Sequence, residues 1–150
     1  MKKIRTRHLG IYSLSLIVSA TSIPFISSSC ESKKKFLEYE QIVEIIKSKN
    51  IEEQKIDDSK NPELKIYKNE FLYFEKVVSH IWNNGPKKYK ISNFWQKDFY
   101  IQWINNFKNS LKKFENWKEK ILTNQTIEAS EKYEEGFWKK VLVERFKVKE

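Results

Sequence analysis

Apolar residues recur at helical spacing in four stretches of the chain. The first two stretches cover residues 36–49 and 62–83, and in the second one the apolar positions repeat at steps of 4, 3, 4 and 3 residues. A third stretch covers residues 92–122 with a near-heptad stripe, and a fourth covers residues 128–146. Steps of three and four residues place side chains on one face of a helix, so the pattern predicts four amphipathic helices.

The same pattern predicts which side chains are buried. On the third helix we expect Phe107 and Leu111 in the core. The fourth helix contains Gly136, which weakens a helix by about 1 kcal/mol relative to alanine. It carries one stripe at four-residue spacing, formed by Tyr133, Phe137, Val141 and Arg145.

Glycine and proline are scarce in this part of the chain. After Cys30 they occur only at Pro62, Gly85, Pro86 and Gly136. A β-sheet domain needs more turn residues than this, whereas Pro62 suits the first position of a helix. We therefore predict an all-α fold, a small bundle of three to four helices that follows an N-terminal segment. A three-helix bundle with a loosely docked first helix is the nearest alternative.

The N-terminal segment has the pattern of a secretory signal peptide. It opens "MKKIRTRH", with four basic residues and no acidic one, and continues with an apolar stretch over residues 9–26 that ends at three serines. The alternative is a retained transmembrane helix, which needs about 20 consistently apolar residues. This stretch is shorter, rich in hydroxyl groups and interrupted by Pro24.

The only cysteine of the chain follows directly in "ISSSC", and this junction resembles the lipobox of bacterial lipoproteins of the mycoplasma type. In that family the cysteine becomes the first residue of the mature protein and its thiol receives a diacylglycerol. Ser28 and Ser29 supply the small residues, whereas Ser27 departs from the usual leucine. The resemblance implies a signal peptide over 1–29 and membrane attachment by lipid on Cys30, including a palmitate-type chain.

Lipid on Cys30 would divide the remaining chain into two parts. Residues 30–35 would form a lipidated, lysine-rich tether, and residues 36–150 a helical domain on the extracytoplasmic face of the cell membrane. Two acyl chains hold a protein stably, while one holds it only marginally. The alternative is a free, unmodified thiol.

Charge narrows the choice of partners. The chain has 29 basic and 20 acidic residues, but four basic ones precede Cys30, so 25 against 20 leaves +5 for the remainder. Arg145 is the only arginine after Cys30. Because arginine is the side chain that reads base edges with a bidentate fork, its scarcity disfavours sequence-specific nucleic-acid binding. Nonspecific contact with polyanions stays open.

Candidate chemistry is sparse. His80 is the only histidine after the signal segment, so the usual nitrogen and sulfur ligands of zinc are lacking and no nucleophile motif accompanies it. We expect no cofactor, no metal and no enzymatic activity. The remaining candidates for acid–base work are carboxylates, with Glu131 and Glu135 on one face of the predicted fourth helix. The acidic positions considered are Asp57, Asp58, Glu128, Glu131, Glu134 and Glu135.

An aromatic and basic segment is the candidate for a contact surface. It includes Lys87, Lys88, Tyr89, Lys90, Phe94 and Trp95. Aromatic rings among lysines suit stacking on a sugar, a base or a protein side chain, unless the rings plug the end of the bundle. We expect a lipid-anchored surface protein that binds a protein, glycan or polyanion, or serves a structural role. The alternatives are a hydrolase-like enzyme with a carboxylate site and a nonspecific polyanion-binding protein.

Overall fold

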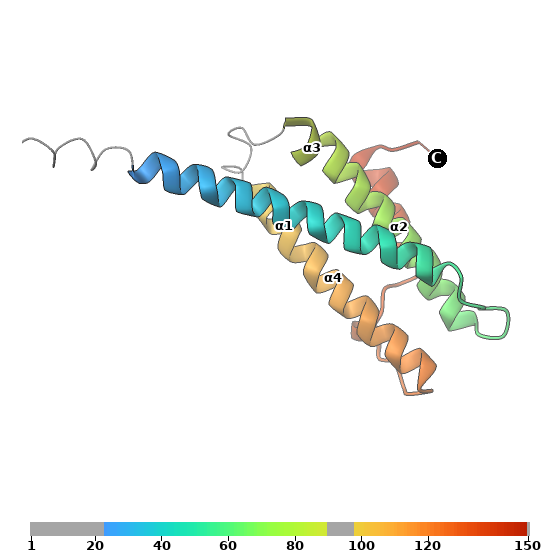
Figure 1. Cartoon of the computed structure of the whole chain (residues 1–150). Helices are drawn as coiled ribbons and strands as arrows, with labels where there is room; N and C mark the ends of the chain where they lie inside the picture. The colour runs from blue at the N-terminus through green and yellow to red at the C-terminus, as the bar shows by residue number, and fades with distance from the viewer. Residues whose placement is uncertain (1–22, 90–97, 150) are drawn as a thin grey trace, which may run out of the picture.

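The computed structural model of the chain describes residues 23–89 and 98–149, and Figure 1 shows their arrangement. All regular structure in these two ranges is helical, which confirms the all-α prediction. The long helices are α1 (Ile23–Glu53), α2 (Pro62–Asn84) and α4 (Asp98–Leu122). Shorter elements are α3 (Pro86–Tyr89), the 3-10 helix η2 (Ala129–Glu131), α5 (Phe137–Lys140) and the π-helix η3 (Val141–Arg145).

Helix α2 lies at the centre of the bundle. It contacts α1 and α4 along its length, and α5 and η3 pack onto it from the C-terminal part of the chain. Helices α1 and α4 also contact each other, so the three long helices enclose one core. Tyr39, Val43 and Ile46 of α1 are fully buried, so the first helix is firmly docked and not loosely attached.

Aromatic rings fill most of this core. Phe74 of α2 lies near the middle, with ring centroids 5.2 Å from Phe114, 6.1 Å from Phe107 and 4.8 Å from Trp138. Phe107 is fully buried as predicted, whereas Leu111 is only half-buried at the edge of the core. Buried rings contribute both area and edge-to-face contacts, so this cluster supplies much of the packing energy.

Helix α2 begins and ends where its sequence predicts. The Asn61 Oδ1 atom accepts a hydrogen bond from the Leu64 N–H at 3.2 Å, and Pro62 occupies the first turn, where no N–H is needed. The helix ends at Asn84, directly before Gly85. The third predicted helix was expected to begin at residue 92, and residues 90–97 lie outside the described residues.

Helix α1 is longer than predicted at both ends. Its backbone is helical from Ile23, so residues 30–35, expected as a lipidated tether, are part of a continuous helix. No glycine or proline interrupts the chain between Pro24 and Glu53, and serine, lysine and glutamate are all compatible with a helix interior. At its other end α1 continues to Glu53, four residues beyond the predicted end at residue 49.

The fourth predicted helix is largely wrong. The segment over 128–146 instead contains η2, an extended stretch, and a helix that begins only at Phe137. Gly136 precedes that helix with a φ of 80°, a left-handed conformation that glycine adopts without strain. The side chain of Glu131 accepts a hydrogen bond from the Glu128 N–H at 3.0 Å, which holds the turn of η2. These local interactions replace the first two turns of the expected helix.

Phe114→Ala should destabilise the fold by about 3–5 kcal/mol, because the ring is fully buried among Tyr67, Phe71, Phe74 and Trp117. Leu111→Ala, on the same helix but half-buried, is the matched control and should cost clearly less. Urea unfolding of both variants measures the two losses. Equal losses would show that Leu111 contributes as much to the packing of the core as Phe114 does, contrary to their difference in burial.

Candidate functional site

The residues predicted to form a contact surface are not brought together within the described part of the chain. Lys87 is exposed on α3, and the backbone of Lys88 and Tyr89 completes that short helix. Lys90, Phe94 and Trp95 lie outside the described residues. The aromatic and basic surface therefore stays a prediction. The backbone of Cys30 lies in α1.

His80 occupies a packing position on α2. Its ring centroid lies 5.3 Å from that of Phe146, and its Nδ1 atom lies 3.3 Å from the Asn84 side-chain amide. Within residues 23–89 and 98–149, no group of three or more histidine, cysteine, aspartate or glutamate side chains could hold a metal ion.

The carboxylates expected on the fourth helix have structural roles or are exposed. Glu131 forms a bidentate ion pair with Lys120, whose Nζ atom lies 2.5 and 2.7 Å from the two carboxylate oxygens. The hydrogen bonds from Lys120 and the Glu128 N–H lower the pKa of Glu131. Glu131 and Glu135 do not share a helical face, because residues 132–136 are not helical. The expected carboxylate pair is therefore absent.

Glu70 is the more deeply buried of two carboxylate residues that sequence reasoning missed, the other being Glu53. Its side chain is 1% exposed, and its two carboxylate oxygens accept hydrogen bonds from the Gly136 N–H at 2.5 Å and the Trp138 N–H at 3.0 Å. Burial raises the pKa of Glu70, and these backbone bonds oppose the rise. The signal in the sequence was one acidic residue between Tyr67 and Phe71 on the apolar face of α2. Glu70 caps the start of α5, so its role is to stabilise the packing of the C-terminal segment on α2.

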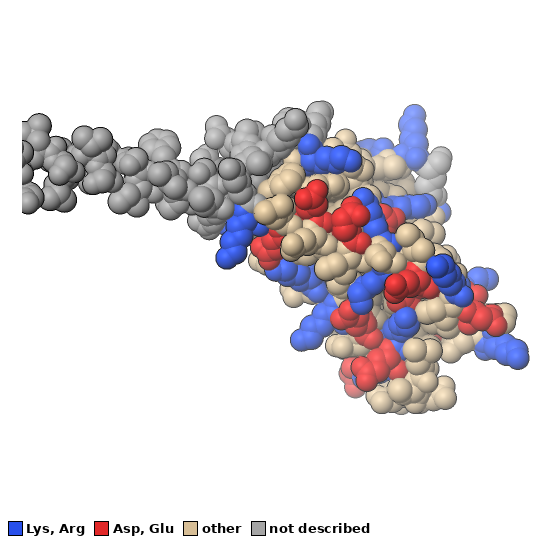
Figure 2. Space-filling model, in the orientation of Figure 1, with Lys and Arg blue, Asp and Glu red and all other residues tan. Residues whose placement is uncertain are grey.

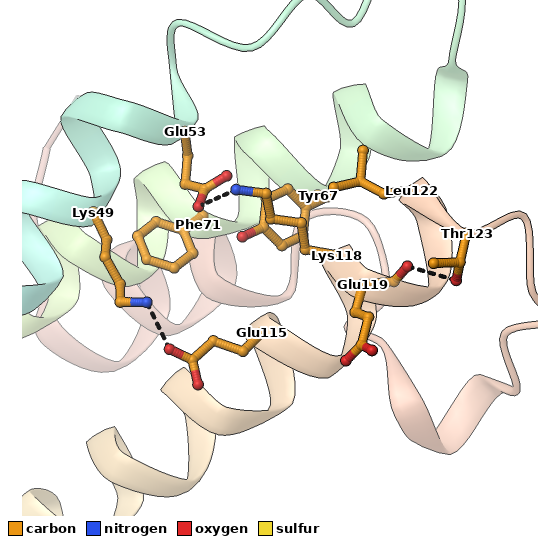
Figure 3. A pocket seen from close by; sticks show the side chains of 9 residues that line it. All are labelled: Lys49, Glu53, Tyr67, Phe71, Glu115, Lys118, Glu119, Leu122 and Thr123. Carbon is orange, nitrogen blue, oxygen red and sulfur yellow. Dashed lines mark hydrogen bonds and ion pairs between the residues drawn. The ribbon is translucent and has the colours of Figure 1, made fainter.

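A cavity of about 350 Å³ lies where the C-terminal ends of α1 and α4 meet α2 (Figure 3). Two ion pairs cross it: the Lys118 Nζ atom lies 2.8 Å from Glu53, and the Lys49 Nζ atom lies 2.6 Å from Glu115. Burial, followed by the negative charge of Glu53, raises the pKa of Tyr67. Glu53 is 6% exposed. Both lysines are paired with carboxylates, so the charged groups at this cavity link α1 to α4.

A second concave surface of about 330 Å³ lies between α4 and the C-terminal segment. We call it the α4 groove and define it by Asn106, Asn109, Lys113, Tyr133, Phe137 and Arg145, together with the neighbouring Trp138 and Val141. Four of these residues, at positions 133, 137, 141 and 145, are the predicted stripe of the fourth helix. This stripe lines a groove on the surface.

The surface seen in Figure 2 shows how the remaining charge is distributed. Basic and acidic side chains alternate over α1 and α4 on this face, and no broad area of one sign occurs among the described residues seen there. Pairs such as Lys47–Glu44 at 3.0 Å account for part of this mixing. The net positive charge is thus dispersed on this face.

Glu70→Gln should change how stability depends on pH. Because the pKa of Glu70 is raised above its ordinary value of 4.5, the folded state binds this proton more tightly than the unfolded state does. The stability that Glu70 contributes is therefore fully present below about pH 4.5 and declines as pH rises through the raised pKa. The difference in unfolding free energy between wild type and Glu70→Gln should shrink from pH 4 to pH 7.

Urea unfolding across that pH range measures the difference. Glu134→Gln, an exposed charge removal in the same segment, is the matched control. A difference that grows toward neutral pH would mean that hydrogen bonding from the backbone outweighs burial and that the pKa of Glu70 is lowered.

Among residues 23–89 and 98–149, no helix is both long enough and apolar enough to cross a membrane. No protein-family model matches the chain, and neither a curated protein nor a solved structure shows significant similarity to it.

Proposed function

We propose that the chain is a lipid-anchored binding module on the extracytoplasmic face of the cell membrane. One observation carries the proposal: a basic start, an apolar stretch and three small residues end at Cys30, the only cysteine. A diacylglycerol on its thiol would supply two acyl chains, and each buried methylene contributes about 0.8 kcal/mol. Such an anchor holds a domain of this size without a transmembrane helix.

The course of α1 gives this anchor a definite reach. Among the residues from Lys34 onward, Tyr39 is the first that is fully buried; it lies nine positions after Cys30, and the backbone between them is helical. At 1.5 Å per residue the two positions are about 14 Å apart along the helix axis. The first turns of α1 extend beyond the rest of the bundle (Figure 1). A helical strut of this length would hold the domain close to the lipid headgroups.

Lysines lie at the membrane end of this strut. Residues 33–35 are three consecutive lysines, and the side chain of Lys34 is exposed. Near an anionic membrane each basic residue adds about 1 kcal/mol of attraction. The lysines would therefore strengthen the lipid anchor.

Binding is the activity that the domain supports better than catalysis. Glu131, a candidate from the sequence, forms an ion pair with Lys120. Glu53 and Glu70, found in the structure, bond to Lys118 and to backbone amides, respectively. These three carboxylates therefore already have structural partners. The α4 groove, in contrast, combines aromatic rings with amide and cationic side chains. Small-molecule sites typically combine apolar walls with a few polar groups in this way.

Cys30→Ala should abolish incorporation of radioactive palmitate and move the protein from the detergent phase to the aqueous phase. Ser29→Ala is the matched control, because alanine is also small and should leave lipidation intact. Labelling of cells that express each variant, followed by phase partition, measures both effects. Equal label in wild type and Cys30→Ala would rule out lipid on this thiol.

A further inference from the structure

The α4 groove has two walls from distant parts of the chain. Asn106, Asn109 and Lys113 are spaced three and four residues apart, so they share one face of α4. The opposite wall comes from the C-terminal segment and includes Tyr133, Phe137 and Arg145. Its volume of about 330 Å³ is near the lower end of the roughly 300–1,000 Å³ typical of small-molecule sites, so it suits a single small unit or a chain end.

The charge of the groove is positive and uncompensated among its described lining residues. Lys113 and Arg145 line it, and none of the described residues that line it is an aspartate or glutamate. The Lys113 Nζ atom lies 4.5 Å from the ring centroid of Tyr133, and the Arg145 Cζ atom lies 5.1 Å from that of Trp103. Contacts with a ring do not use up the N–H donors of a cation. Both side chains can therefore bind an anionic group.

Uncharged hydrogen-bonding groups lie beside the two cations. Asn106 and Asn109 are exposed, and each amide offers both a donor and an acceptor. Trp138 also lines the groove, and its buried indole N–H has no acceptor among the described residues. A ligand with several hydroxyl oxygens would provide partners for the two asparagine amides.

The apolar part of the groove favours a saturated ring over a nucleobase. A nucleobase stacks on an open aromatic face. Trp103 and Trp138 are only 6% and 4% exposed, and the Tyr133 ring is stacked on Phe137 at 5.2 Å and contacted by Lys113. Phe137 itself is 41% exposed. One partly exposed ring suits the C–H face of a sugar.

We propose that the α4 groove binds a hexuronic acid unit, a sugar ring that carries a carboxylate. The carboxylate pairs with Lys113, the hydroxyl groups bond to Asn106, Asn109 and Arg145, and the C–H face of the ring packs on Phe137. This site is independent of the lipid on Cys30, so the anchor and the ligand site can fail separately.

Titration of the full chain in detergent micelles with glucuronic acid tests the proposal. Nuclear magnetic resonance of the tryptophan indole N–H groups should show saturable shifts, with the Trp138 signal among those that move. Glucose and glucuronamide, which lack the negative charge, should bind about tenfold more weakly, because a hydrogen bond to a charged group is lost. Adenosine monophosphate should not bind more tightly than glucuronic acid.

Variants assign the binding to the groove. Lys113→Gln and Arg145→Gln should each weaken binding about tenfold, with the helical circular dichroism unchanged. Lys112→Gln is the matched control, since Lys112 is an exposed neighbour on α4 that does not line the groove. If Arg145→Gln loses helical signal, Lys113→Gln decides the outcome.

Three results would overturn binding of glucuronic acid in the groove, and a fourth would overturn the choice of a sugar acid. The first is the absence of saturable shifts with glucuronic acid, and the second is equal affinity for glucose. The third is a loss in Lys112→Gln as large as the loss in Lys113→Gln, which would mark nonspecific attraction by the lysines. Tighter binding of adenosine monophosphate would overturn the choice of a sugar acid.

Discussion

The buried carboxylate of Glu70 is the interaction on which the C-terminal third of the molecule depends. Two backbone N–H groups, of the partly buried Gly136 and the buried Trp138, would otherwise lack these partners, and a buried N–H without a partner costs free energy comparable to a lost hydrogen bond. By accepting both bonds, Glu70 places the Trp138 ring 4.8 Å from Phe74 in the core. The second wall of the α4 groove exists because this segment is held against α2.

Much of the fold could be predicted from the sequence because its long helices follow local rules. The steps of three and four residues on α2, with Asn61 and Pro62 at its start and Gly85 after its end, predicted its bounds to within a residue. The end of α4 at Leu122 was predicted in the same way. In these helices the apolar spacing and the residues at the two ends indicate the same bounds, so the local sequence was sufficient to predict them.

The C-terminal segment could not be predicted, because its structure is set by contacts over long sequence distances. Tyr133, Phe137 and Arg145 have helical spacing, which is why a helix from 128 was predicted. That helix would start two turns too early, since Gly136 takes a left-handed conformation and bonds to a side chain 66 positions away. The α4 groove was missed for the same reason. No local pattern indicates that residues 106–113 and 133–145 face one another.

The continuous helical backbone of α1 carries a consequence for the direction in which the domain faces. A flexible tether sets only a distance, whereas a helix also sets an azimuth, because successive residues are rotated by about 100° around its axis. With Cys30 held at a membrane, the bundle would have one fixed rotation about the axis of α1 relative to the lipid anchor. Insertion of a single residue between Cys30 and Tyr39 would turn the whole bundle by more than a quarter of a circle. Insertion of seven residues would restore nearly the original heading about 10 Å further out.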